Sequence, residues 1–222
     1  MQLRTFNSFI RSVITEGNRL QRVDINGQIL TSSRFTQTQL ISGFLALIYV
    51  FVSKAGFSES FAGYVISFLS IFIGLFSSIV ISLFDKSFDL KERYLNQNAK
   101  AANNAEDPSE IVQIKKARNY LKQFTGLTSY AIYKAICIIS LLLLTLLTEF
   151  FNNDISSYKI IRSISDITFK SGIIFLNCAA VYLYRFLVIY LLINFFVITL
   201  YAVTSYFSYI LEVYKKQIEK ND

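Results

Sequence analysis

The stretch that decides the fold runs from Ser171 to Leu211 and reads SGIIFLNCAAVYLYRFLVIYLLINFFVITLYAVTSYFSYIL. It carries one charged residue, Arg185, and neither glycine nor proline after Gly172. As one helix it would be about 62 Å long, twice the hydrocarbon thickness of a bilayer. It therefore predicts either two spans or one helix that extends beyond the membrane. We favour a single span near Phe186–Phe207, with Ser171–Tyr184 as an apolar approach at the outer surface, because Arg185 is costly at mid-bilayer and no residue marks a hairpin turn.

Three further apolar runs precede this stretch: Gln39–Ser53, Ser60–Phe84 and Tyr130–Phe151. The first reaches spanning length only if it begins near Gln37. The composition agrees with membrane insertion, since 53% of the residues are hydrophobic and only 17% are charged, against about a quarter charged in a soluble domain. The sequence therefore predicts an all-α polytopic membrane protein with four transmembrane helices. No signal-peptide pattern precedes the first run, which we expect to act as an uncleaved anchor.

The lysines and arginines indicate the orientation of the chain. With four spans, sixteen of the 22 fall on one side, in the amino-terminal arm, between spans two and three, and in the tail. The positive-inside rule then places both termini in the cytoplasm of a multi-pass protein of the cell's inner membrane. A fifth span would send the tail lysines outward, so four spans are favoured.

This reading divides the chain into seven parts. They are a cytoplasmic amphipathic arm with a hairpin (1–36), transmembrane helices one and two (37–84), a cytoplasmic helical hairpin (85–128), transmembrane helix three (129–151), an external loop (152–170), transmembrane helix four with its apolar approach (171–211) and a cytoplasmic tail (212–222).

The arm has two predicted elements. Apolar residues recur at helical spacing from Leu3 to Ile14, with Arg4 and Arg11 between them, which predicts an amphipathic helix that rests on lipid headgroups or packs on the cytoplasmic portion. Asn26-Gly27, flanked by alternating apolar residues, predicts a tight hairpin. A structural cap and a contact surface for a partner both remain open.

The segment between spans two and three reads as two antiparallel helices. Asp107 and Pro108 are typical of the cap and the first position of the second helix. Its basic residues form either an ordinary solvated face or a contact with anionic lipid or a protein partner: Lys115, Lys116, Arg118 and Lys122. Eight positive against six negative charges do not make the concentrated basic stripe that nucleic acid needs, so we expect nucleic-acid contact only indirectly, through a partner.

Span two carries small residues at three- and four-residue spacing along one face: Gly63, Ser67, Ser70, Gly74, Ser78 and Ser82. Helices associate in lipid through close packing of small residues, so this face should meet another helix. Packing within the chain, a subunit contact in a homo-oligomer and a hydroxyl-lined water path remain as alternatives.

Several polar groups in the spans need partners. Glu149 and Arg185 both lie near the outer ends of their spans and are predicted to form an ion pair. Lys134 is expected to pair with Glu212 or to extend toward the headgroups. Asn177 and Asn194 are each expected to hydrogen-bond across helices, and we favour structural roles over transport for all of them.

Missing residue types exclude several chemistries. The chain has no histidine, so it lacks a Ser-His or Cys-His relay and an imidazole metal site. Cys137 and Cys178 lie in apolar runs, where we expect small buried hydrophobes, and no Gly-rich phosphate loop follows a strand. We therefore expect a protein that is not an enzyme and that has neither cofactor nor metal.

The four apolar runs and the insertion at 85–128 resemble the membrane subunit of small prokaryotic antiviral operons, Kiwa in particular. The resemblance implies a homo-oligomer in the inner membrane that senses infection and works with a cytoplasmic DNA-binding partner. The leading hypothesis is a non-enzymatic membrane scaffold or sensor that recruits a soluble protein through the arm and the cytoplasmic helices. The alternative is a pore or channel-like effector in which the small-residue face lines a conduction path.

Overall fold

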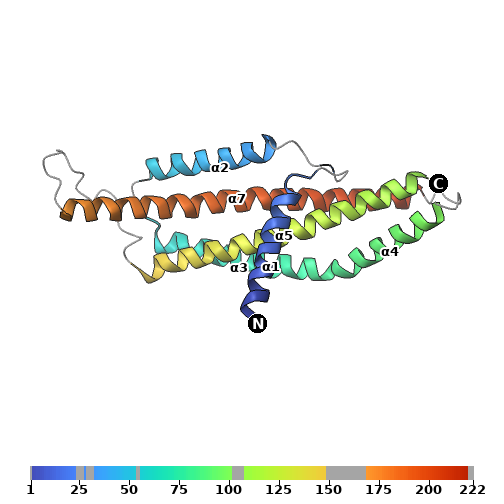
Figure 1. Ribbon diagram of the computed structural model, residues 1–222, viewed down its shortest axis with the longest axis horizontal. Helices are drawn as coiled ribbons and strands as arrows, with labels where there is room; N and C mark the ends of the chain where they lie inside the picture. The colour runs from blue at the N-terminus through green and yellow to red at the C-terminus, as the bar shows by residue number, and fades with distance from the viewer. Residues whose placement is uncertain are drawn as a thin grey trace. The chain divides into compact units, whose positions relative to one another are not determined.

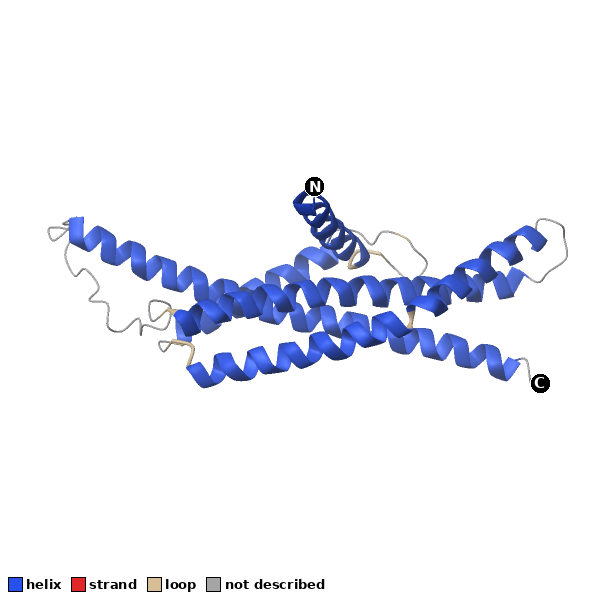
Figure 2. Cartoon of the chain, turned by 90° about the horizontal axis from the view of Figure 1, so that it is seen from below, coloured by secondary structure: helices blue, strands red, loops and turns tan. Residues whose placement is uncertain are grey.

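The computed structural model describes residues 2–23, 28, 33–53, 56–101, 108–148 and 169–219. These residues form helices and no strand (Figures 1 and 2). In chain order the helices are α1 (Gln2–Leu20), α2 (Ser33–Val52), α3 (Glu59–Ser82), α4 (Phe84–Ala101), α5 (Pro108–Leu147) and α7 (Phe169–Glu219). A helix satisfies every backbone polar group internally, which is why long apolar runs adopt it in lipid.

Three helical stretches are long and apolar enough to cross a membrane: Glu59–Asn96, Val112–Leu147 and Phe175–Tyr214. At most 39% of the residues in their most apolar windows are buried within the chain, so much of this apolar surface faces outward. A soluble protein rarely exposes such continuous apolar surface, whereas a bilayer covers it. The chain is thus a membrane protein that contacts lipid.

The remaining predicted span, transmembrane helix one, corresponds to α2. Its described apolar part, Gln39–Val52, is shorter than the other three stretches. The whole helix has 20 residues, or about 30 Å, the lower end of what a bilayer requires. Crossing by α2 therefore stays a prediction.

Two helices are long and continuous. α7 contains 51 residues and has no break, so no hairpin turn interrupts the apolar stretch that begins at Ser171. α5 contains 40 residues and is described from Pro108 onward, in agreement with the predicted helix start. Its first half carries the basic residues and its second half is apolar.

The chain forms two compact units. The first unit comprises Met1–Phe35, Ile73–Tyr133 and Phe196–Asp222, and the second comprises Thr36–Phe72 and Lys134–Phe195. In the first unit the rings of Phe124 and Tyr206 lie 4.9 Å apart between α5 and α7. In the second unit Phe72 of α3 meets Phe195 of α7 edge-to-face, at 4.8 Å.

Some predicted features lie outside the described residues. They are the Asn26-Gly27 hairpin, the cap residue Asp107, and most of the external loop together with Glu149. Cys137 and Cys178 are free and half-buried rather than fully buried.

Candidate functional site

A buried polar cluster joins three helices of the second unit. Lys134 of α5 is 8% exposed and Asn194 of α7 is 2% exposed. The Lys134 ammonium donates to Asn194 Oδ1, and Asn194 Nδ2 donates to Gln39 Oε1 of α2 at 2.8 Å. The Tyr190 hydroxyl donates to the same Gln39 oxygen. We call Lys134, Asn194, Gln39 and Tyr190 the polar cluster.

The arrangement of the polar cluster follows from which of its side chains donate hydrogen bonds and which accept them. An ammonium only donates, whereas an amide side chain both accepts and donates, so Asn194 passes the interaction from Lys134 to Gln39. Burying a polar group without a partner is costly, which fixes the rotation of the three helices that carry these side chains. The predicted hydrogen bond of Asn194 across helices is confirmed, and Asn194 is a partner of Lys134 that the sequence did not predict.

A second polar contact joins α5 and α7. The Tyr184 hydroxyl donates to the Leu141 carbonyl oxygen at 2.5 Å and lies 2.5 Å from Thr145 Oγ1. Thr145 and Tyr184 are both buried. Both polar contacts therefore join neighbouring helices. The polar groups of the polar cluster are two amides, a phenol and one ammonium.

Arg185 is buried, with 2% of its surface exposed. Its predicted partner Glu149 lies outside the described residues, so the ion pair stays a prediction. Among the residues that the structure describes, no group of three or more His, Cys, Asp or Glu side chains could hold a metal ion.

The small-residue face of α3 is turned outward. Ser67, Ser70, Gly74, Ser78 and Ser82 are exposed and Gly63 is half-buried, while the buried residues of the helix are Ala62, Leu69 and Phe72. A methyl group added at Gly63 or Gly74 would meet nothing within 4 Å. The Ser78 and Ser82 hydroxyls donate to carbonyl oxygens of α3 itself, at 3.0 Å and 2.9 Å. Packing within the chain, one of the predicted alternatives, therefore does not occupy this face in the described part.

The basic residues of α5 differ in their surroundings. The Arg118 guanidinium lies over the Tyr94 ring of α4, 4.5 Å from its centroid. Lys122 Nζ lies 3.5 Å from Glu16 Oε1 of α1. Lys115 is exposed and Lys116 is half-buried. Among these four residues of α5, Lys115 is thus the one most open to a partner.

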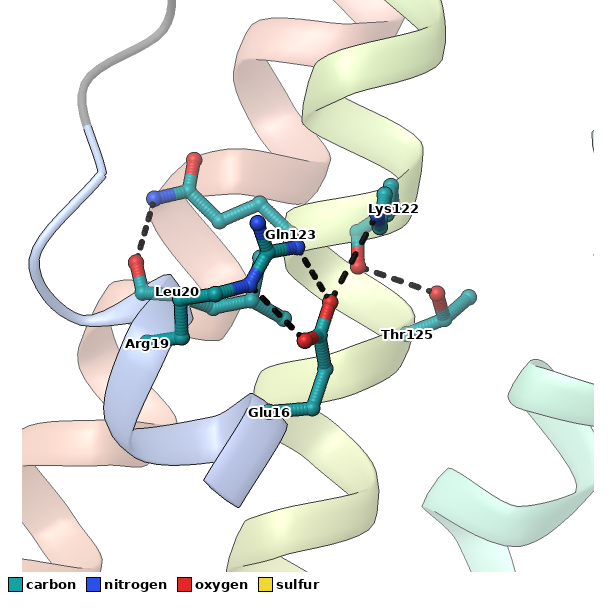
Figure 3. A network of polar contacts seen from close by, with 6 residues as sticks. All are labelled: Glu16, Arg19, Leu20, Lys122, Gln123 and Thr125. Carbon is teal, nitrogen blue, oxygen red and sulfur yellow. Dashed lines mark hydrogen bonds and ion pairs between the residues drawn. The ribbon is translucent and has the colours of Figure 1, made fainter. Parts of the chain in front are cut away.

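The carboxyl-terminal half of α1 docks on α5 (Figure 3). Gln123 Nε2 donates to the carbonyl oxygens of Leu20 and Val23, each at 3.3 Å. The Tyr130 hydroxyl donates to Asn18 Oδ1 at 3.2 Å. The backbone of Gly17 lies so close to Tyr130 that a methyl group there would overlap the first atoms of that side chain.

The end of this docked segment carries an ion-pair network. Arg19 donates to both carboxylate oxygens of Glu16, at 2.8 Å and 2.6 Å. Together with the charge of Lys122, these bonds hold the pKa of the Glu16 carboxyl below its usual value of 4.5 and raise the pKa of Arg19. Arg11 of the same helix is exposed, and the Arg4 side chain lies outside what the structure describes.

A cavity of about 290 Å³ opens between α4, α5 and α7 in the first unit. Ile114, Ala117 and Tyr209 are buried at its wall. Its charged lining residues carry two charges of each sign: Lys86, Arg93, Asp89 and Glu212. This balance does not favour a strongly charged ligand.

Two contact residues were missed from the sequence. Gln39 was treated only as the start of a span, although an amide next to an apolar run is a signal for a buried hydrogen bond. Gly17 lies on the apolar face of α1, where a glycine is a signal for close approach of another helix.

Comparison with known proteins gives no family assignment, because no protein-family model, curated protein or solved structure matches the chain.

Proposed function

We propose that the protein is a non-enzymatic, oligomeric membrane scaffold or sensor that recruits a cytoplasmic partner protein. In this proposal four helices cross the inner membrane with both termini in the cytoplasm, as the positive-inside rule favours. α4 and the first part of α5 form the cytoplasmic helical hairpin. The resemblance to Kiwa-like operons extends the proposal to antiphage defence.

The observation that carries the proposal is the outward-facing small-residue face of α3. Close contact of helices in lipid requires small residues, and glycines at Gly63 and Gly74 lower intrinsic helix stability by about 1 kcal/mol each relative to alanine. Because nothing within 4 Å fills the space next to them, a second copy of the chain is the natural partner for this face. The serine hydroxyls that bond to their own helix can enter such a contact without unsatisfied donors.

Gly74→Leu tests the oligomer. The leucine side chain has open space within the chain, so the variant should fold, but it would hold two α3 helices apart. We expect a shift from oligomer to monomer in native mass measurements of detergent-solubilised protein. The matched control is Leu75→Ala, which alters a neighbouring exposed position that is not one of the small residues. An oligomer that survives Gly74→Leu would contradict the proposed interface.

Cysteine crosslinking gives an independent readout of the same face. In a Cys137→Ser, Cys178→Ser background, Ser70→Cys should form a disulfide between copies, whereas Leu75→Cys should not. Crosslinks of equal yield at both positions would indicate random collision instead of a defined interface.

Partner recruitment is tested at Lys115. Charge reversal by Lys115→Glu should weaken co-purification of a soluble protein encoded beside this chain. The control is Lys91→Glu, which changes an exposed basic residue of α4.

Phage plating on cells that carry the wild-type or the Gly74→Leu gene tests the role in defence.

The pore alternative predicts a different result. Ion flux into liposomes that contain the protein, abolished by Ser70→Leu, would favour a channel. Flux equal to that of empty liposomes, alongside retained partner binding, would favour the scaffold.

A further inference from the structure

We propose that the amino-terminal half of α1 lies in the plane of the membrane, with its apolar face in an anionic lipid surface. This inference concerns the arm alone and does not depend on oligomerisation or on a protein partner. Four observations on the first unit carry it.

The first observation is how α1 is held. Its carboxyl-terminal half is fixed to α5 by the close contact at Gly17, by the buried Leu20 and by the bonds from Gln123. Figure 1 shows α1 running across α5 instead of along it. If α5 crosses the bilayer, a helix lying across it runs along the membrane surface.

The second observation is where α1 crosses. Its contacts on α5 lie between Gln123 and Tyr130. On one side of this segment α5 carries the basic residues up to Lys122, and on the other side the only charge as far as Leu147 is Lys134. The crossing point is therefore the boundary between the polar and apolar parts of a helix that is able to span a membrane, which is the level of the headgroups.

The third observation is the exposed apolar surface beyond the docked half. Phe9 is 66% exposed, while Ile10 and Val13 are half-buried. Phe9 lies about 12 Å along the helix from Gly17. Ser8 is exposed and lies about 100° around the helix from Phe9, farther from the apolar face. An aromatic side chain held out at the headgroup level on an amphipathic helix is the arrangement that inserts into a lipid interface.

The fourth observation is the charge. α1 contains Arg4, Arg11 and Arg19 against a single acidic residue, Glu16. Arg19 already pairs with Glu16, so the remaining charge of the helix is positive and matches anionic headgroups.

The test uses the full chain in lipid vesicles. In a Cys137→Ser, Cys178→Ser background, a single cysteine at Phe9 or at Ser8 is labelled with an environment-sensitive fluorophore. The two positions are neighbours, but only Phe9 belongs to the apolar face. Vesicles of phosphatidylcholine, with or without about one third phosphatidylglycerol, contain lipids that carry a spin label near the headgroup.

We expect the spin-labelled lipid to quench the probe at position 9 at least about threefold more than the probe at position 8. Phosphatidylglycerol should increase the difference, and Arg11→Glu should decrease it. Equal quenching at the two positions would overturn the proposal. So would a probe at position 9 that is shielded from both the lipid quencher and aqueous iodide, because protein would then cover this face.

Discussion

Single side chains in the polar cluster show how a membrane helix bundle obtains a defined register. Apolar surface alone does not orient helices in lipid, because neighbouring lipid chains are as apolar as leucine. Asn194 accepts from Lys134 and donates to Gln39, so one residue ties α7 to two of its neighbours in the second unit, α5 and α2. Removing it should take one hydrogen bond from the buried Lys134 and one from Gln39.

Asn194→Leu should therefore lower the stability of the protein by about 1–3 kcal/mol, the cost of leaving buried polar groups unsatisfied. Lys134→Met should cost less, because Asn194 and Gln39 keep their hydrogen bond. Thermal unfolding in detergent measures both variants. Asn177→Leu, at a half-buried position of the same helix, is the control and should change stability little.

At the same scale, Glu16 gives the arm a pH dependence. Its pKa is lower in the folded protein than the usual 4.5, so the ionised carboxylate stabilises the docked arm above that value. The contribution is lost as the pH falls through the folded pKa, below about 4.5. Since Glu16 is partly exposed, the effect should stay under about 1 kcal/mol. Protection factors of the α1 amides, which correct for the slower intrinsic exchange at low pH, should fall at acidic pH, and a Glu16→Gln variant should show no such fall.

α1 and α5 approach each other closely at two glycines, because a larger side chain would hold the helices apart. A methyl group at Gly17 would overlap Cβ and Cγ of Tyr130, atoms that cannot move unless α5 moves. At Gly126 it would meet only the end of the Leu20 side chain, which can rotate away. A larger residue should thus be tolerated less well at Gly17 than at Gly126.

Gly17→Ala should detach α1 or destabilise its docking by about 1–3 kcal/mol, as overpacking does. Gly126→Ala should cost less and serves as the matched control. Limited proteolysis between α1 and α2 reports the docking. Equal cleavage of the two variants would show that the close approach at Gly17 is not what holds the helix.

Sequence periodicity predicted these elements better than it predicted their contacts. The cap signal at Pro108 located the start of α5, and the lack of glycine or proline after Gly172 agrees with an unbroken α7. The partner of Lys134 could not be predicted, since a shift of one turn between two long helices exchanges Asn194 for another residue. The small-residue face was predicted, but its outward direction depends on which side of α3 buries Leu69 and Phe72.

For the whole molecule, whether the two termini lie on the same side of the membrane depends on whether α2 crosses it. Three crossings would place the two ends of the chain on opposite sides of the membrane, and a fourth crossing by α2 returns them to the same side. We expect four crossings, because most of the fixed positive charge then faces the cytoplasm. Reporter fusions to each terminus should both give a cytoplasmic signal. An external signal from the carboxyl terminus would require α2 to lie on the membrane or α7 to cross twice.

The ammonium of Lys134 has an electrical consequence in an energised cell. A fixed charge inside the hydrocarbon region experiences the voltage across it, and its energy changes by about 2.3 kcal/mol when it traverses 100 mV. Even a small axial displacement of α5 would therefore perform electrical work. Depolarisation would reduce the electrical force on Lys134. The hydrogen bonds through Asn194 and Gln39 would transmit this change to α5, α7 and α2 together.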